Sequence, residues 1–180
     1  GTSVNGCTNT AVASITVNTL PTVTATPSSS VICNGGSATL TGSGTASTYT
    51  WTGGVTNGVA FSPTTTLTYT VTGTDGNGCF TKAVSTVSVN PKPIVASTTT
   101  GSVICDGSST TLSGTGANTY TWSSGVSDGV AFTPTATATY TVIGTNAVTG
   151  CTNSAVRTIT VTNLPAVNAN ASNSVICLGG

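Results

Sequence analysis

Apolar and polar residues alternate along several short stretches of the chain, and a period of two is typical of half-buried β-strands. In residues 67–72, Leu67, Tyr69 and Val71 fall on one face and threonines fill the other. Residues 83–89 alternate in the same way. No stretch shows helical periodicity, and the abundant Val, Ile and Thr favour strands. The pattern therefore predicts an all-β chain.

Clusters of Gly, Asn, Asp and Pro separate the alternating stretches and mark turns between strands. For residues 21–92 we expect strands near 22–26, 37–42, 48–52, 58–62, 67–74 and 80–90. Six or seven short strands in about 72 residues are typical of a small sandwich of two β-sheets, as in immunoglobulin-like modules.

An internal repeat of 72 residues organises the whole chain. Cysteines follow one another at alternating intervals of 26 and 46 residues, which together give this period. The segment Ser-Val-Ile-Cys ends at Cys33, Cys105 and Cys177, and Tyr-Thr-Trp ends at Trp51 and again at Trp122. Repetition at a fixed period predicts tandem copies of one structural module.

The repeat and its prolines divide the chain into parts. Residues 1–20 are predicted to end one module, 21–92 and 93–164 to form complete modules, and 165–180 to begin another. A proline opens each new part, where it ends the preceding strand and stiffens a short linker. We therefore predict an all-β chain of tandem immunoglobulin-like β-sandwich modules, as an internal piece of a longer protein.

Composition narrows the classes of function. Charged residues make up 3% of the chain, and there is no His. General acid–base catalysis and nucleophilic triads need His, Glu or paired Asp side chains, so we expect neither an enzyme nor a cofactor. Three basic residues cannot neutralise a phosphate backbone, which excludes nucleic acid as a partner. Asp75, Asp106 and Asp128 are not equivalent in the repeat, so we expect no calcium or other metal.

The cysteines are expected to form disulfides, because small modules bury little apolar surface and often need such bonds. Metal binding would need closely spaced cysteine pairs or histidine partners, and the sequence has neither. The candidates are Cys7, Cys33, Cys79, Cys105, Cys151 and Cys177.

Two pairings of these cysteines remain open. Cys33 and Cys79 are expected at opposite ends of one module, and strands of six to ten residues span about 20 to 33 Å. A disulfide needs Cα atoms within about 7 Å of each other. We therefore favour a bond from Cys33 to Cys151, between modules of a head-to-tail array. Bonds within modules, Cys33–Cys79 and Cys105–Cys151, remain the alternative.

Aromatic residues recur at equivalent positions of the two modules, and we expect them in the cores rather than in a ligand site. A tryptophan on a central strand is buried in immunoglobulin-like sandwiches. The expected core residues are Trp51, Trp122, Tyr69, Tyr140, Phe61 and Phe132. The threonine-rich outer faces are expected to be solvated strand surface.

Several motifs carry a resemblance to a known family. They are Ile-Cys-x-Gly-x-Ser-x-Thr-Leu over residues 32–40, Tyr-Thr-Trp over 49–51, Thr-Tyr-Thr-Val over 68–71 and Gly-Cys at 78–79, with second-module counterparts. Together they resemble the immunoglobulin-like and PKD-like repeats of very large Bacteroidetes surface proteins, which include gliding-motility adhesins and substrates of type IX secretion. The resemblance implies export, and attachment to or release from the outer surface through a carboxy-terminal sorting domain.

From these observations we expect a structural segment of an extracellular filament or stalk, at the cell surface or secreted, that adds length and stiffness. An adhesion module that recognises a surface carbohydrate or protein is the alternative. Fibres of several chains joined through sheet edges are a remoter one. The expected partners are neighbouring modules and other copies of the chain, without direct membrane insertion.

Overall fold

A computed structural model describes residues 1–170 of the chain. The structure is all-β and contains two similar modules of about 70 residues, which confirms the predicted all-β class and the internal repeat. The chain divides into its two compact units between Asn90 and Pro91. This division lies two residues before the boundary expected from the sequence, at Lys92–Pro93.

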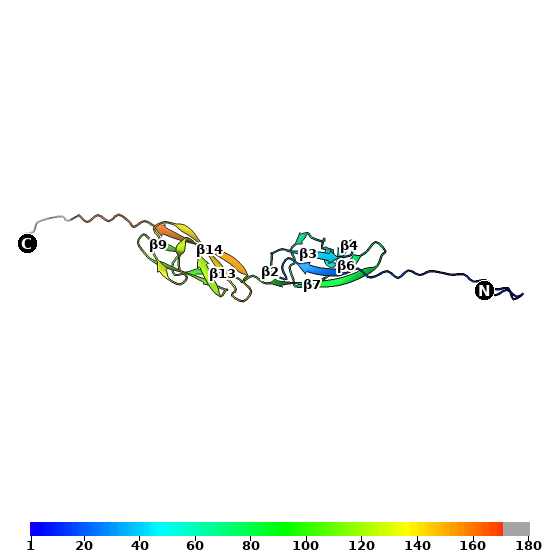
Figure 1. Ribbon diagram of the computed structural model, residues 1–180. Coiled ribbons are helices and arrows are strands. Elements are labelled where there is room, and N and C mark those ends of the chain that lie inside the picture. The colour runs from blue at the N-terminus through cyan, green and yellow to red at the C-terminus, as the bar shows by residue number, and fades with distance from the viewer. Residues whose placement is uncertain (171–180) are drawn as a thin grey trace, which may run out of the picture. The chain divides into compact units, whose positions relative to one another are not determined.

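The first module consists of two sheets. Strands β1, β3 and β5 form an antiparallel sheet, and the order β2-β7-β6-β4 forms a mixed one in which only β2 and β7 are parallel (Figure 1). The strands are β1 Val23–Pro27, β2 Val31–Cys33, β3 Ala38–Gly44, β4 Thr48–Trp51, β5 Ala60–Phe61, β6 Leu67–Thr74 and β7 Phe80–Asn90. A single 3-10 turn, η1 Thr52–Gly54, follows β4.

The second module repeats this arrangement strand for strand. Its antiparallel sheet has the order β12-β10-β8, and its mixed sheet has the order β11-β13-β14-β9. The strands are β8 Ala96–Thr99, β9 Val103–Cys105, β10 Thr110–Thr115, β11 Thr119–Trp122, β12 Ala131–Phe132, β13 Ala138–Thr145 and β14 Thr152–Thr162. The turn η2 Ser123–Gly125 follows β11.

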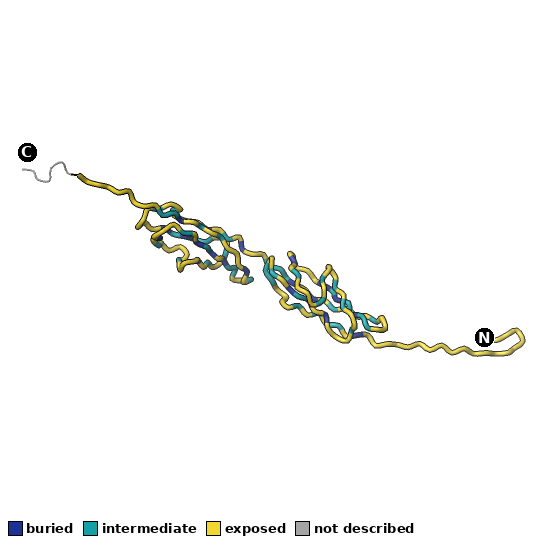
Figure 2. The backbone as a smooth tube through the Cα atoms, turned by 90° about the horizontal axis from the view of Figure 1, so that it is seen from above, coloured by how far each residue is buried: buried dark blue, intermediate teal, exposed yellow. Residues whose placement is uncertain are grey.

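A small apolar core lies between the two sheets of each module, where Figure 2 shows the buried positions. Each fully buried Val, Leu or Ile side chain contributes roughly 1.5–3 kcal/mol, so a handful of them stabilises a module of this size. In the first module the core cluster is Ala38, Leu40, Tyr69 and Val87. In the second it is Leu112, Trp122, Tyr140, Val142 and Ile159.

The predicted alternation holds in the middle of the long strands. Tyr69 and Val71 in β6 are buried, and so are Ser85 and Val87 in β7. Leu67 was expected on the same inward face, but it is 50% exposed. It is the first residue of β6, and the buried positions of this strand begin only at Tyr69.

A valine at or directly before the first strand of each module packs close to a glycine in the mixed sheet. At Gly144 in β13, an added Cβ would lie 2.6 Å from Cγ2 of Val95, a distance that side chains do not adopt. Gly73 in β6 faces Val23 in the same way. Glycine at these positions lets the beginning of each module reach the end of β6 or β13.

The amino-terminal segment, predicted to be the last part of a preceding module, is extended. Within the described chain its only β-pairing is a bridge between Thr2 and Thr8. Val12, Ile15 and Val17 are all about nine-tenths exposed, and Figure 2 shows the whole segment as exposed.

Candidate functional site

The cysteines lie at the two ends of the longest strand of each module. In the first module, Cys33 ends β2 and lies opposite Asn90, the last residue of β7. The backbone N–H of Asn34 donates to the carbonyl of Asn90 at 2.8 Å, which ties the cysteine to the point where the chain leaves the module. We call this the exit end of the module.

The second module has the same exit end. Cys105 ends β9 opposite Thr162, the last residue of β14. The N–H of Asp106 donates to the carbonyl of Thr162 at 2.9 Å. Cys33 and Cys105 therefore occupy equivalent register positions in the two modules.

The other cysteine of each module lies in the hairpin that precedes the long strand. In the first module, Asp75 accepts hydrogen bonds through Oδ1 from the N–H groups of Asn77 and Cys79, both at 2.9 Å. The N–H of Asp75 donates to the carbonyl of Cys79 at 3.0 Å. Asn146 organises the hairpin of Cys151 in the second module, where its N–H donates to the carbonyl of Cys151 at 2.9 Å.

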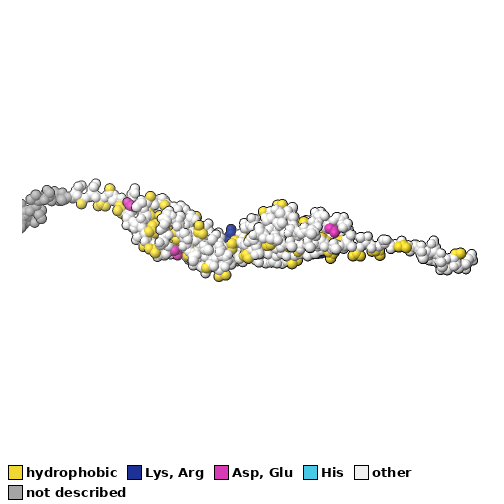
Figure 3. All heavy atoms as spheres, in the orientation of Figure 1, with side chains coloured by type: hydrophobic (Ala, Val, Ile, Leu, Met, Phe, Trp, Pro, Cys, Tyr) yellow, Lys and Arg dark blue, Asp and Glu magenta, His cyan; other side chains and the backbone are white. Residues whose placement is uncertain are grey.

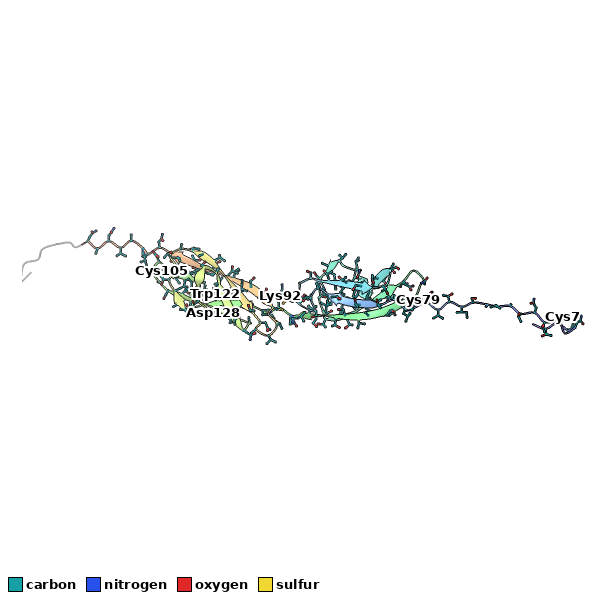
Figure 4. All side chains as sticks on the ribbon, viewed as in Figure 1. Cys7, Cys79, Lys92, Cys105, Trp122 and Asp128 are labelled. Atoms are coloured by element: carbon teal, nitrogen blue, oxygen red, sulfur yellow. The ribbon has the colours of Figure 1, made fainter. Side chains whose placement is uncertain are left out.

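These hairpins lie at the end where the chain enters each module. In the second module, the Nδ2 amide of Asn153 donates to the carbonyl of Pro93 at 3.0 Å, so the entering segment lies against the start of β14. In the first module the start of β1 packs against Gly73, beside the hairpin that ends in Cys79. We call this the entry end. Figure 4 shows Cys79 where the amino-terminal segment meets the first module, and Cys105 where the chain leaves the second.

Cys33 and Cys151 form a disulfide with each other. This is the between-module pair that the sequence argument favoured. The bonds of the within-module alternative, Cys33–Cys79 and Cys105–Cys151, are not formed, since Cys79 and Cys105 carry free thiols. The register explains why, because β7 separates Cys79 from the level of Cys33 by eleven residues, a span of about 36 Å.

The remaining cysteines differ in their surroundings. Cys7 is exposed and free, and Cys177 lies outside the described residues. Cys151 in the disulfide is fully buried, whereas Cys79 is half-buried and Cys105 is exposed. A buried disulfide is protected from reductants, and an exposed thiol is open to exchange.

The aromatic residues expected in the cores lie in or against them. Tyr69, Tyr140 and Trp122 are 5–6% exposed, while Trp51, Phe61 and Phe132 are partly buried against the core clusters. The Phe and Tyr of each module meet edge to face, with ring centroids 5.2 Å apart in both modules. This repeated contact fixes β5 and β12 against the longer strands.

One feature of both modules was not predicted: a polar anchor for each tryptophan. Nε1 of Trp51 donates to Oδ1 of Asn57 at 2.9 Å, and the same oxygen accepts from the N–H of Gly42 at 2.6 Å. In the second module, Trp122 donates to Oδ1 of Asp128 at 2.8 Å. Figure 4 labels this second pair. The signal in the sequence is an Asn or Asp six residues after each Trp.

Two of the three acidic residues considered for metal binding hold turns and anchors. Asp75 organises a hairpin, and Asp128 holds Trp122. Among the residues that the structure describes, no group of three or more His, Cys, Asp or Glu side chains could hold a metal ion. The same part of the chain forms no pocket.

Uncharged hydroxyl side chains cover much of the outer face of each mixed sheet. Thr68 and Thr86 share a hydrogen bond at 2.8 Å across β6 and β7, and Thr139 and Thr158 do so at 2.9 Å across β13 and β14. Figure 3 shows few charged groups among uncharged ones. No helix in the described part of the chain is long and apolar enough to cross a membrane.

Comparisons with known proteins do not assign the chain to a family. No protein-family model matches the chain, and no curated protein matches it either.

Proposed function

We propose that the chain is a structural repeat segment of an extracellular filament or stalk, in which consecutive modules are cross-linked by disulfides. The observation that carries this proposal is the Cys33–Cys151 bond, which joins an exit-end cysteine to the entry-end cysteine of the next module. A linker alone leaves two modules free to reorient. A second covalent connection restricts that freedom, so tandem modules with such bonds add stiffness as well as length.

The strand orders support an immunoglobulin-like assignment for each module. In the first module β1, β3 and β5 correspond to strands A, B and E, and β4, β6 and β7 to C, F and G. Trp51 at the end of β4 takes the place of the strand C tryptophan. Here the bond between the sheets, which antibody domains place around that tryptophan, is replaced by one that leaves the module.

The same bond supports export to an oxidising compartment. Disulfides persist in extracellular and periplasmic proteins and are rare in the reducing cytosol. Together with the motifs around the cysteines, this favours a large bacterial surface protein as the parent of the segment.

The proposal predicts that the disulfide limits motion between the modules. We expect backbone ¹⁵N relaxation of the oxidised chain to give both modules one shared, long rotational correlation time. A Cys33→Ser/Cys151→Ser variant should give shorter and separate values, because only the linker then couples the modules. The Cys79→Ser/Cys105→Ser variant keeps the bond and serves as the matched control.

The indole N–H signals of Trp51 and Trp122 report on the folding of each module during this experiment, one signal per module. If both signals stay in place while the correlation times are unchanged by the loss of the bond, the disulfide does not stiffen the chain. The structural proposal would then fail.

A further inference from the structure

The dipeptide Asn-Gly occurs at four places in the chain, which begin at Asn5, Asn34, Asn57 and Asn77. In this dipeptide the backbone nitrogen of the glycine can attack the side-chain amide carbon of the asparagine, because glycine has no Cβ to hinder the approach. Asparagine is accordingly one of the residues that degrade on heating. The attack needs a glycine nitrogen that can move and an asparagine in contact with water. The fold therefore decides which of the four dipeptides reacts.

The dipeptide at Asn57 is the most strongly held. Oδ1 of Asn57 accepts hydrogen bonds from the indole of Trp51 and the N–H of Gly42, and the residue is partly buried. The N–H of Gly58 donates to the carbonyl of Leu40 at 2.9 Å. The attack would break all three hydrogen bonds, so Asn57 reacts only when this part of the module opens.

The glycine nitrogen is also held in two dipeptides that lie in hairpins. The N–H of Gly78 donates to the carbonyl of Asp75 at 3.2 Å. The N–H of Gly6 donates to the carbonyl of Ser3 at 3.0 Å. The asparagines before both glycines are exposed, so it is the hydrogen bond on the glycine nitrogen that protects them.

The dipeptide at Asn34 is different, because its glycine nitrogen is not held. Asn34 and Gly35 are both exposed, in the turn that follows β2 at the exit end of the first module. The N–H of Gly36 closes this turn by donating to the carbonyl of Cys33 at 2.8 Å. Within residues 1–170 the N–H of Gly35 has no hydrogen-bond acceptor. The reacting nitrogen and the amide that it attacks are thus both open to water.

We propose that Asn34 is a site of spontaneous deamidation, at which the turn beside the disulfide changes into aspartyl and isoaspartyl forms. The nitrogen of Gly35 bonds to Cγ of Asn34, the bond from Cγ to the side-chain nitrogen breaks, and ammonia leaves with the proton of the Gly35 N–H. Water then opens the succinimide ring. Cleavage at Cγ gives the aspartyl form, and cleavage at the main-chain carbonyl gives the isoaspartyl form.

The second module carries the aspartyl form at the equivalent position. Asp106 follows Cys105 as Asn34 follows Cys33. The N–H of Asp106 donates to the carbonyl of Thr162, and the N–H of Ser108 closes the turn by donating to the carbonyl of Cys105 at 3.0 Å. An aspartyl residue therefore fits this turn. The isoaspartyl form does not, because its main chain runs through the side chain and is one methylene longer.

Deamidation matters for this chain because the chain has so few charges. Each event adds one negative charge to a chain with three acidic residues, three basic residues and a formal net charge of +0. The added charge lies directly after Cys33, one of the two cysteines of the disulfide. The turn would thus change its charge and part of its backbone with age, and no enzyme is needed.

The test incubates the full, oxidised chain at mildly alkaline pH and follows the three asparagines of the first module by peptide mapping and mass spectrometry. Isoaspartyl methyltransferase with labelled S-adenosylmethionine counts the isoaspartyl groups. We expect Asn34 to react about tenfold faster than Asn57 and Asn77, a factor that corresponds to roughly 1.4 kcal/mol for opening the held dipeptides. The three rates should become similar in denaturant with reductant, because the dipeptide is the same. A rate at Asn34 no higher than the other two in the folded chain would overturn the proposal.

Two variants place the same dipeptide in the second module, in one open and one held position. Asp106→Asn does so in the exposed turn, where the N–H of Gly107 has no acceptor in the described part of the chain. Asp128→Asn is the matched control, since the N–H of Gly129 donates to the carbonyl of Leu112 at 2.9 Å, as Gly58 does to Leu40.

We expect the asparagine introduced at position 106 to deamidate at a rate close to that of Asn34. The one introduced at position 128 should be as slow as Asn57. Equal rates for the two introduced asparagines in the folded chain would show that the hydrogen bond on the glycine nitrogen does not control the reaction, and the assignment of Asn34 would fail.

Discussion

At the scale of single residues, the two tryptophan anchors show how the modules tolerate sequence change. Asn57 and Asp128 differ in charge, yet the Oδ1 of each accepts the indole N–H and a backbone N–H from the neighbouring strand. Either residue can form the anchor, because the anchor needs only a side-chain oxygen that accepts these two hydrogen bonds. The charge of Asp128 is therefore not required for the anchor.

Removing the acceptor should destabilise a module. Asn57→Ala leaves the indole N–H of Trp51 and the N–H of Gly42 without their partner, and we expect a loss of about 2 kcal/mol. Chemical denaturation followed through tryptophan fluorescence measures this change. Asn57→Asp, which copies the second module, is the matched control and should cost much less. Equal losses for both variants would mean that the amide itself matters.

At the scale of elements, the two faces of β14 differ strongly in burial. Ile159 is fully buried in the second core, whereas Val156 is 65% exposed on the outer face of the same strand. Burial of an apolar side chain stabilises the fold, and exposure adds almost nothing. The contribution of a side chain to the stability of the module therefore depends on which face of the long strand it occupies.

This difference predicts unequal effects of truncation in one strand. Ile159→Ala should lower the free energy of unfolding of the second module by about 3 kcal/mol, through lost burial and a remaining cavity. Val156→Ala should change it by less than about 0.5 kcal/mol. Thermal or urea unfolding of the two variants provides the comparison. A similar loss in both would contradict the assignment of faces.

The sequence anticipated most elements of this architecture, but it missed two. The alternation in β6 and β7 was strong enough to place both strands and their inward faces. Strands β2 and β9 have three residues each, between turn residues, and their parallel partners lie more than fifty residues away. Local patterns carry no information on such pairing. The anchors of the tryptophans were missed although their acceptors lie only six residues further along the chain, because an Asn or Asp in a loop is equally typical of a turn.

The cysteine pairing was accessible because it depends on length rather than on side-chain detail. The span of one long strand excludes a bond between Cys33 and Cys79, whatever the residues in between. The end at which each cysteine lies followed from the strand order expected of a two-sheet module. The burial of Cys151 and the exposure of Cys105 did not follow, since both depend on packing of the hairpins and turns.

At the scale of the whole molecule, the near absence of charge is the dominant property. Lys and Arg together number three, as do the acidic residues, in 180 positions. Solubility therefore rests on hydroxyl and amide groups. Electrostatic interactions between exposed charges contribute little to stability in any case.

Stability should accordingly be insensitive to salt. Raising the sodium chloride concentration about tenfold should shift Tm by less than roughly 2 °C, because few charges are available for screening. Differential scanning calorimetry of the oxidised chain measures this shift. A larger change would mean that the few charged groups interact with one another, although they are far apart in the sequence.

The parallel pairing of β2 with β7, repeated by β9 with β14, has a mechanical consequence. When a chain of modules whose disulfides are reduced is stretched, one end of each module is pulled through the start of β1 and the other through the end of β7. The two parallel strands then slide along each other, and their hydrogen bonds are loaded together instead of being peeled apart one by one. Each module should therefore act as a shear clamp that yields only at high force.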